Sequence, residues 1–256
     1  METNGIEMKT WNGKELLEMR FPDRKDCVKD FLPQGIGLFG GRPYSGKLRI
    51  LLEICASVAL GAPLWGMETT RGDVLYITRG KTMRDMQRLM KTIHAEGIGN
   101  LYFADETEKS PEGLRAQIGD FIDKHPDTRL VVIDPMMGYV GYNAGEEKPV
   151  TALAWIGQMK RFADERGISI LLVKNTKNKR IGSSVDCSFG MEESVGSTDF
   201  TMYFSCYRLS PIAGILVVAI NGSQERDLRF SLDWESGRWI FKSEAPQVEE
   251  WRGCAK

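Results

Sequence analysis

The sequence has few cysteines, and none of them are closely paired. The five cysteines, Cys27, Cys55, Cys187, Cys206 and Cys254, are scattered over 256 residues and form no C-x-x-C pair. An odd number without short spacing argues against a disulfide framework and against a zinc site, and it is typical of proteins from a reducing compartment. We therefore expect a cytoplasmic protein.

The sequence also lacks a long apolar run. Its longest apolar stretch, near residues 50–60, is interrupted by Glu53 and is too short to cross a bilayer. The N-terminus has neither the basic region nor the apolar region of a signal peptide. We therefore expect no membrane partner.

An excess of charge of one sign is missing as well. Lysine and arginine together number 34 against 35 for aspartate and glutamate, which gives a net charge of −1. Such a chain has no overall field that attracts nucleic acid, so any contact with DNA must come from a local basic patch. The 42% of hydrophobic residues is ordinary for a globular protein with a sizeable core.

Apolar strands alternate with helices over most of the chain. Strands are expected at 36–39, 74–78, 101–104, 129–133 and 168–173, and helices at about 47–60, 83–93, from 111, and 150–165. This alternation predicts an α/β fold with a mostly parallel sheet covered by helices on both faces. Further strands near 200–205, 213–220, 228–232 and 239–241 predict antiparallel additions at one edge.

No repeat or linker divides this pattern. We expect an N-terminal arm at residues 1–33, one α/β domain at 34–243 and a C-terminal tail at 244–256.

The segment after the first expected strand matches the G-x-x-x-x-G-K core of a Walker A loop. In such a loop, backbone N–H groups and the next helix N-terminus surround the phosphates, and the lysine neutralises the terminal one. The alternative is a glycine turn that matches by chance. Because the segment follows a strand and opens a helix, we expect it to bind ATP or another nucleotide. Its residues are Gly41, Arg42, Pro43, Tyr44, Ser45, Gly46 and Lys47.

Two positions determine how this site would hold Mg²⁺. The residue after the lysine should be Ser or Thr, whose hydroxyl coordinates the ion, but it is Leu48. The strand at 129–133 ends in Asp134, the form of a Walker B acid, which holds the metal directly or through water. The alternative role for Asp134 is to cap the turn before Pro135. Asp134 is the candidate metal ligand, and Mg²⁺ binding is expected to be weak or absent.

A basic segment is the candidate DNA-binding loop. Lys174, Lys177, Lys179 and Arg180 place four cations within seven residues, where a RecA core carries a DNA-contacting loop. The alternative is a solvated loop.

Several segments together resemble the RepA-like hexameric helicases, which are RecA-fold ATPases of plasmids, phages and integrated elements. They read GGRPYSGK at 40–47, GDVLYI at 72–77, HPDTRLVVID at 125–134 and ADERGISILLV at 163–173. The resemblance extends from about residue 32 to 241 and includes the closing hairpin LRFSLDWESGRW at 228–239. It implies a RecA-like P-loop core, ATP and Mg²⁺ between subunits, a hexameric ring, and single-stranded DNA in the channel.

The departures from this family all affect hydrolysis. The family has a glutamate that polarises the attacking water, two histidines that sense the γ-phosphate or DNA, and an arginine given to the neighbouring subunit's nucleotide. In this chain these places are taken by Gly80, by Lys174 and Asn175, and by Asn221 in the matching position. Together with Leu48, they alter four parts of one mechanism. An arginine finger alone is worth about 10³–10⁵ in rate, so we expect turnover near background.

Three hypotheses follow. The first is a degenerate RepA-like protein that binds nucleotide, or is purely structural, in a DNA replication or maintenance process of a mobile element. It would act as a homo-oligomer or beside an active ATPase partner. The second is an active ATPase or helicase with a rewired site, in which Asp186, Glu192 or Glu193 supplies the acid. The third is a DNA-binding scaffold that needs no nucleotide.

Overall fold

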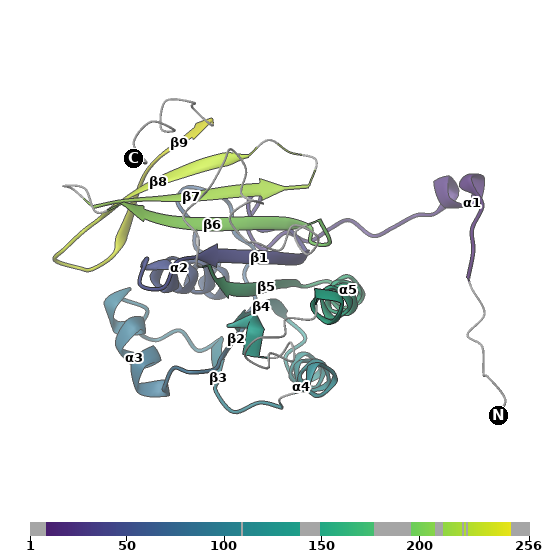
Figure 1. The fold of residues 1–256 in the computed structure, drawn as a ribbon, viewed down its shortest axis with the longest axis horizontal. Helices are drawn as coiled ribbons and strands as arrows, with labels where there is room; N and C mark the ends of the chain where they lie inside the picture. The colour runs from purple at the N-terminus through teal and green to yellow at the C-terminus, as the bar shows by residue number, and fades with distance from the viewer. Residues whose placement is uncertain are drawn as a thin grey trace.

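One twisted sheet organises the molecule (Figure 1). The computed structural model describes residues 9–108, 110–138, 149–176, 196–207, 212–221, 223 and 225–246. The described strands form a single nine-stranded sheet in the order β3-β2-β4-β5-β1-β6-β7-β8-β9.

The first half of this sheet is parallel, as the alternating pattern predicts. β1 pairs with β5, β5 with β4, β4 with β2, and β2 with β3, all in parallel. The strand that leads into the glycine-rich segment is therefore separated by one strand from the strand that ends in Asp134. The strands are β1 (Gly35–Gly41), β2 (Asp73–Thr78), β3 (Leu101–Ala104), β4 (Thr128–Asp134) and β5 (Ser169–Asn175).

The second half is antiparallel, which confirms the expected additions at one edge. The first of these strands runs parallel to β1, and the three that follow form an antiparallel meander. They are β6 (Phe200–Tyr207), β7 (Ala213–Ile220), β8 (Arg226–Leu232) and β9 (Trp239–Pro246).

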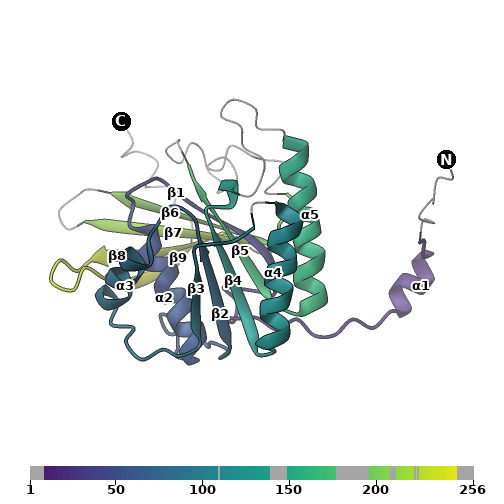
Figure 2. The ribbon, with the colours of Figure 1, turned by 90° about the horizontal axis from the view of Figure 1, so that it is seen from below.

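Helices cover both faces of the parallel strands (Figures 1 and 2). α2 (Lys47–Leu60) and α3 (Met83–Thr92) lie on one face, and α4 (Pro111–Lys124) and α5 (Pro149–Arg166) lie on the other. A short 3₁₀ helix, η1 (Met136–Gly138), follows β4. Among the described helices, none combines the length and the apolar character that a bilayer crossing requires.

The sheet separates two hydrophobic clusters, because successive residues of a strand point to opposite faces. In β1, Phe39 belongs to the cluster under α2, whereas Ile36 and Leu38 belong to the cluster under α4 and α5. In β4, Val132 and Ile133 divide in the same way. Strands buried on both faces read as continuous apolar runs, which explains why the sequence pattern identified them.

The N-terminal residues differ sharply in burial. The short helix α1 (Gly13–Glu18) is capped by Asn12, has no buried residue and lies apart from the sheet in Figure 2. In contrast, Cys27, Phe31 and Leu32 are fully buried. Burial raises the pKa of the Cys27 thiol to about 12, so this cysteine is an uncharged core residue.

Asp199, just before β6, makes polar contacts with several elements at the edge of the sheet where β1 begins. Its carboxylate accepts a hydrogen bond of 3.0 Å from the Ile36 backbone N–H and lies 3.1 Å from the ammonium of Lys160 on α5. The guanidinium of Arg24 lies 3.5 Å from the same carboxylate. Gly35 has a φ of +122°, and a β-carbon there would be 2.4 Å from an Asp199 oxygen, so only glycine fits. The carboxylate therefore links the N-terminal segment, the sheet and α5.

We expect Asp199→Ala to lower the free energy of unfolding by about 2–4 kcal/mol, because it leaves the Ile36 N–H and the Lys160 ammonium without their acceptor. Chemical denaturation followed by circular dichroism measures this loss. The matched control is Asp123→Ala, which removes the partner of Arg166 at a carboxylate whose side chain is 60% exposed. The control should cost under about 1 kcal/mol. Equal losses in the two variants would contradict the assigned role of Asp199.

Candidate functional site

The candidate site lies where four neighbouring parallel strands end. β1 ends at Gly41, β2 at Thr78, β4 at Asp134 and β5 at Asn175. Since these strands run in the same direction, their carboxyl ends meet at one edge of the sheet, which is the edge where open α/β sheets bind ligands. The predicted phosphate loop and the predicted metal ligand are thus brought to the same edge.

The glycine-rich segment has the strand–loop–helix form that the sequence predicts. β1 leads into the loop, and Gly46 caps the N-terminus of α2 with a φ of +85°. A β-carbon on Gly46 would lie 2.7 Å from the indole nitrogen of Trp239, so the close approach of β9 also requires glycine here. Tyr44, at the tip, is 99% exposed and has a φ of +61°, an uncommon conformation for a residue other than glycine. Backbone strain of this kind clusters at ligand sites.

Lys47 is held across the opening of the loop. Its ammonium donates to the Arg42 carbonyl at 3.3 Å and to the Asn175 side-chain oxygen at 2.6 Å. Burial lowers the pKa of Lys47, Asp134 raises it, and the positive charge of Lys81 lowers it. The electrostatic influence of both residues on Lys47 indicates that the three charges share one site.

Two buried polar groups beside the loop have no hydrogen-bond partner among the described residues. They are the Ser45 hydroxyl and the Trp239 indole N–H, in side chains whose residues are 8% and 3% exposed. Buried polar groups are nearly always satisfied in native proteins, so an unpaired hydroxyl within this loop makes it a candidate for ligand contact.

Leu48 is part of the hydrophobic packing and does not supply a metal ligand. It is partly buried and packs against the hydrophobic cluster under α2. An apolar side chain in this environment stabilises the first turn of α2 by burial, and it supplies no oxygen to the site.

Asp134 is almost fully buried, and its carboxylate already has two partners. The residue is 5% exposed. The Tyr76 hydroxyl donates to its Oδ2 atom at 2.7 Å, and the Lys81 ammonium lies 3.6 Å from the same oxygen. Burial raises the pKa of Tyr76 well above its usual value, and the charge of Asp134 raises it further. The phenol therefore stays protonated and donates to the carboxylate.

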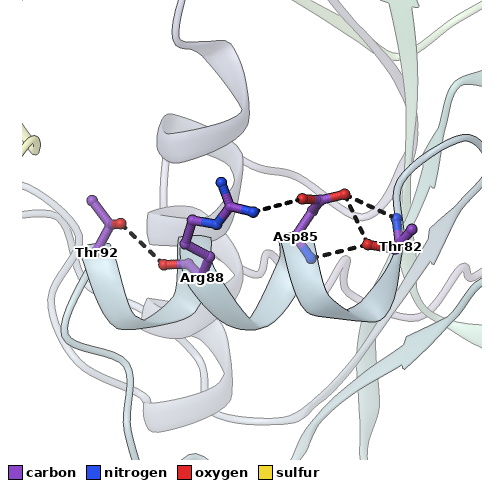
Figure 3. A network of polar contacts seen from close by, with 4 residues as sticks. All are labelled: Thr82, Asp85, Arg88 and Thr92. Carbon is purple, nitrogen blue, oxygen red and sulfur yellow. Dashed lines mark hydrogen bonds and ion pairs between the residues drawn. The ribbon is translucent and has the colours of Figure 1, made fainter.

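Local backbone structure fixes the start of the segment that carries Lys81. The Arg79 N–H donates to the Asp134 carbonyl at 3.0 Å, and Gly80 turns the chain with a φ of +98°. Thr82 then caps α3: its hydroxyl accepts from the Asp85 N–H at 3.2 Å and donates to the Asp85 carboxylate at 2.8 Å (Figure 3). The turn and the capping box leave Lys81 little backbone freedom beside Asp134.

Further side-chain contacts continue along α3 toward its C-terminus. Asp85 lies 3.2 Å from the guanidinium of Arg88, and the Thr92 hydroxyl donates to the Arg88 carbonyl at 3.0 Å (Figure 3). The hydrogen bonds from Thr82 lower the pKa of Asp85, so this carboxylate is charged at the positive end of the helix.

The arrangement does not fit a Mg²⁺ ion of the usual P-loop kind. Mg²⁺ requires near-octahedral oxygen ligands at about 2.0–2.1 Å. Leu48 supplies no oxygen, and the Lys81 ammonium lies beside the carboxylate that would hold the metal. A second cation about 4 Å from an ammonium is repelled by about 4 kcal/mol per unit charge at an effective dielectric constant of 20. Within the described ranges, no cluster of three or more His, Cys, Asp or Glu side chains could hold a metal either.

The other residues that the sequence singled out do not all lie at the candidate site. Lys174, at the end of β5, is paired in register with Gly40 of β1. Asn221 lies at the opposite edge of the sheet. Its side-chain amide donates to the Thr198 carbonyl at 2.7 Å, and its backbone N–H donates to the Asp199 backbone carbonyl at 3.0 Å. The predicted DNA-contacting residues Lys177, Lys179 and Arg180, and the alternative acids Asp186, Glu192 and Glu193, lie outside the described residues.

The sequence reasoning missed Lys81, Tyr76 and Asn175 as parts of the site. Asn175 was interpreted only through the histidine that it replaces, and the interpretation of the segment after β2 rested on Gly80 alone. The signal for Lys81 was its place three residues after a strand that ends at the ligand edge. For Tyr76 it was a phenol within a buried strand, where the hydroxyl needs a partner.

Comparison with known proteins decides the family. A family model described as an AAA domain, AAA_25, matches residues 6–180, which is more than half of the chain. The chain belongs to this AAA domain family. No curated protein matches it.

Solved structures show what fold this AAA domain has. It is similar to the "ATPase Domain of G40P" with a TM-score of 0.61 and 13% identity, covering 82% of this chain and 85% of that one. It is also similar to the KaiC-like protein PH0186 of the archaeon Pyrococcus horikoshii OT3, with a TM-score of 0.59 and 13% identity, covering 85% and 94%. The AAA domain therefore has the predicted RecA-like P-loop fold.

We expect Tyr76→Phe to lower the free energy of unfolding by about 1–2 kcal/mol, because the buried Asp134 carboxylate loses a hydrogen-bond donor. The matched control is Tyr102→Phe, a half-buried ring packed against Phe121 and His125. It should change stability by less than about 0.5 kcal/mol. Urea denaturation of both variants provides the test, and a Tyr76→Phe protein as stable as its parent would contradict the assigned hydrogen bond.

Proposed function

We propose that this AAA domain binds a nucleotide, with ATP as the first candidate, and hydrolyses it slowly or not at all. The main support for this proposal is that two groups of residues in the same site differ in how well they match a P-loop ATPase. The phosphate loop and its lysine keep the arrangement suited to phosphate, whereas the residues that would act on water and metal are replaced.

Support for binding comes from the loop and the helix that follows it. The loop leads directly into the N-terminus of α2, where the first backbone N–H groups of a helix lack partners within it and the helix dipole favours an anion. Among the described residues, the hydrogen-bond acceptors of Lys47 are neutral: they are the Arg42 carbonyl and the Asn175 side-chain oxygen. Its positive charge therefore remains available to a phosphate group.

Support for slow hydrolysis comes from the position that corresponds to the family's glutamate. Gly80 occupies it, with a left-handed φ of +98°. A β-carbon there would meet no atom within 4 Å, so a side chain has room, but the backbone conformation disfavours every residue except glycine. The chain therefore differs from an active site in its backbone as well as in the missing carboxylate.

We also propose a biological setting at a finer level. The segments that resemble RepA-like helicases support a role in replication or maintenance of a mobile element. The protein would form a homo-oligomer, with a hexameric ring as the family's arrangement, or act beside an active ATPase. The location would be the cytoplasm, and single-stranded DNA is the proposed nucleic-acid partner.

We expect the full chain to bind a fluorescent ATP analogue while turning over ATP at or near background, with or without DNA. Lys47→Ala should lower the affinity about tenfold or more, because it removes a charged contact to phosphate. A fluorescence titration and a phosphate-release assay measure the two properties. Lys29→Ala, at an exposed lysine that pairs with Glu68, is the control and should leave both unchanged.

Either half of this proposal can fail on its own. Turnover of about 1 s⁻¹ or more that is abolished by Lys47→Ala would identify an active ATPase with a rewired site. Absence of binding by the parent protein would favour the scaffold that needs no nucleotide.

We expect binding to single-stranded DNA to depend on Lys174, Lys177, Lys179 and Arg180, because a net charge of −1 supplies no general attraction. Replacing all four by glutamine should weaken binding and flatten its salt dependence, since each phosphate contact contributes about 0.7 to the log–log slope. Fluorescence anisotropy at several salt concentrations tests this. Undiminished binding by the quadruple variant would contradict the assignment.

A further inference from the structure

Two ammonium groups and a single carboxylate form the polar centre of the site. Lys47 is the first residue of α2, Lys81 precedes α3, and Asp134 ends β4. The Lys81 ammonium lies 3.6 Å from Asp134, and the charges of both residues influence Lys47. The three charges sum to one positive charge, so the centre is suited to an anion and not to a further cation.

We propose that Lys81 takes the place of the divalent cation: its ammonium binds the polyphosphate of a metal-free nucleotide beside Lys47 while it neutralises Asp134. This inference rests on the proposed nucleotide binding and assigns a second phosphate-binding residue to the same site. In a P-loop site that uses metal, the ion lies between the Walker B acid and the phosphates. Here one ammonium would contact both.

The exposure of Lys81 supports a ligand-binding role over a purely internal ion pair. Its side chain is 36% exposed, whereas that of Asp134 is 7% exposed. An ammonium has three N–H donors, and only the contact with Asp134 is seen for Lys81 among the described residues. Donors that remain available at the ligand edge of the sheet can bind phosphate oxygens.

The electrostatics of the site support the same role. Burial lowers the pKa of Lys47, Asp134 raises it and the charge of Lys81 lowers it, so the two ammonium groups repel each other while both are attracted to Asp134. A polyphosphate between them would relieve this repulsion. The same phosphate would be repelled by Asp134 if Lys81 did not neutralise that carboxylate.

The backbone gives this lysine a defined position. Gly80 makes the turn after β2, and the Thr82–Asp85 capping box fixes where α3 begins (Figure 3). Only the side chain of Lys81 needs to move to contact a ligand, so the ordering cost on binding is confined to one flexible stem.

Removing the metal separates this mechanism from an ordinary P-loop site. The probe is a fluorescent ATP analogue, titrated into the full chain with excess EDTA and with excess Mg²⁺. The parent protein should bind in EDTA at least as tightly as in Mg²⁺. Lys81→Met should bind at least tenfold more weakly in EDTA, because one charged phosphate contact is lost and Asp134 is left unneutralised. Added Mg²⁺ should restore part of that loss, since the freed carboxylate can now hold the ion.

Two further variants isolate the role of the charge. Lys81→Gln keeps a donor for Asp134 but has no charge, so it should also lose metal-free binding; a purely structural lysine would be rescued by it. Lys91→Met removes an exposed lysine from the last turn of α3 and should bind within twofold of the parent. Thermal unfolding of each variant checks that it is folded.

The outcomes are distinct. Parent-like binding by Lys81→Gln and Lys81→Met in EDTA would overturn the inference and leave Lys81 as a partner of Asp134 only. A parent protein that binds only with Mg²⁺ would also overturn the inference but leave nucleotide binding intact. A parent that binds in neither condition would overturn the proposed function itself.

Discussion

The contact between Asp134, Tyr76 and Lys81 is the constraint on which the chemistry of this site depends. A buried carboxylate must be compensated, because an isolated charge in the interior is costly. In this chain the compensation is internal: a phenol hydroxyl at 2.7 Å and an ammonium at 3.6 Å. A carboxylate satisfied by the protein itself has less need of a metal, so the contact of Lys81 with Asp134 and the apolar side chain at Leu48 are physically consistent with each other.

Phosphate binding and hydrolysis place different demands on the residues at the strand ends. Phosphate binding depends on backbone groups and one lysine, which a strand, a loop and a helix N-terminus position together. Hydrolysis depends on side chains from several strand ends. Gly80 and Asn175 lie at two of those strand ends. Gly80 forms the turn before α3, and the Asn175 side chain accepts a hydrogen bond from Lys47. This difference underlies our proposal that the site binds a nucleotide and hydrolyses it slowly or not at all.

Most of the fold could be predicted because its strands are buried on both faces and read as continuous apolar runs. Strand β4 and the helix-opening Ser110-Pro111 are examples in which local chemistry and tertiary position agree. The loop at Gly41–Lys47 was likewise recognisable from its glycines and lysine. The contacts of Lys81 and Asn175 could not be predicted, because they join residues 53 and 128 positions apart in the sequence from their partners. The sequence indicated where this chain departs from the family that it resembles, but only the packing of the strand ends shows what Lys81 and Asn175 contact.

The most direct measurement is a crystal structure of the full chain with a non-hydrolysable ATP analogue, grown in the presence of Mg²⁺. We expect the Lys81 ammonium to lie within hydrogen-bonding distance of both a phosphate oxygen and the Asp134 carboxylate, with no metal between that carboxylate and the phosphates. A Mg²⁺ ion held by Asp134, directly or through water, with Lys81 turned away from the phosphates, would contradict it.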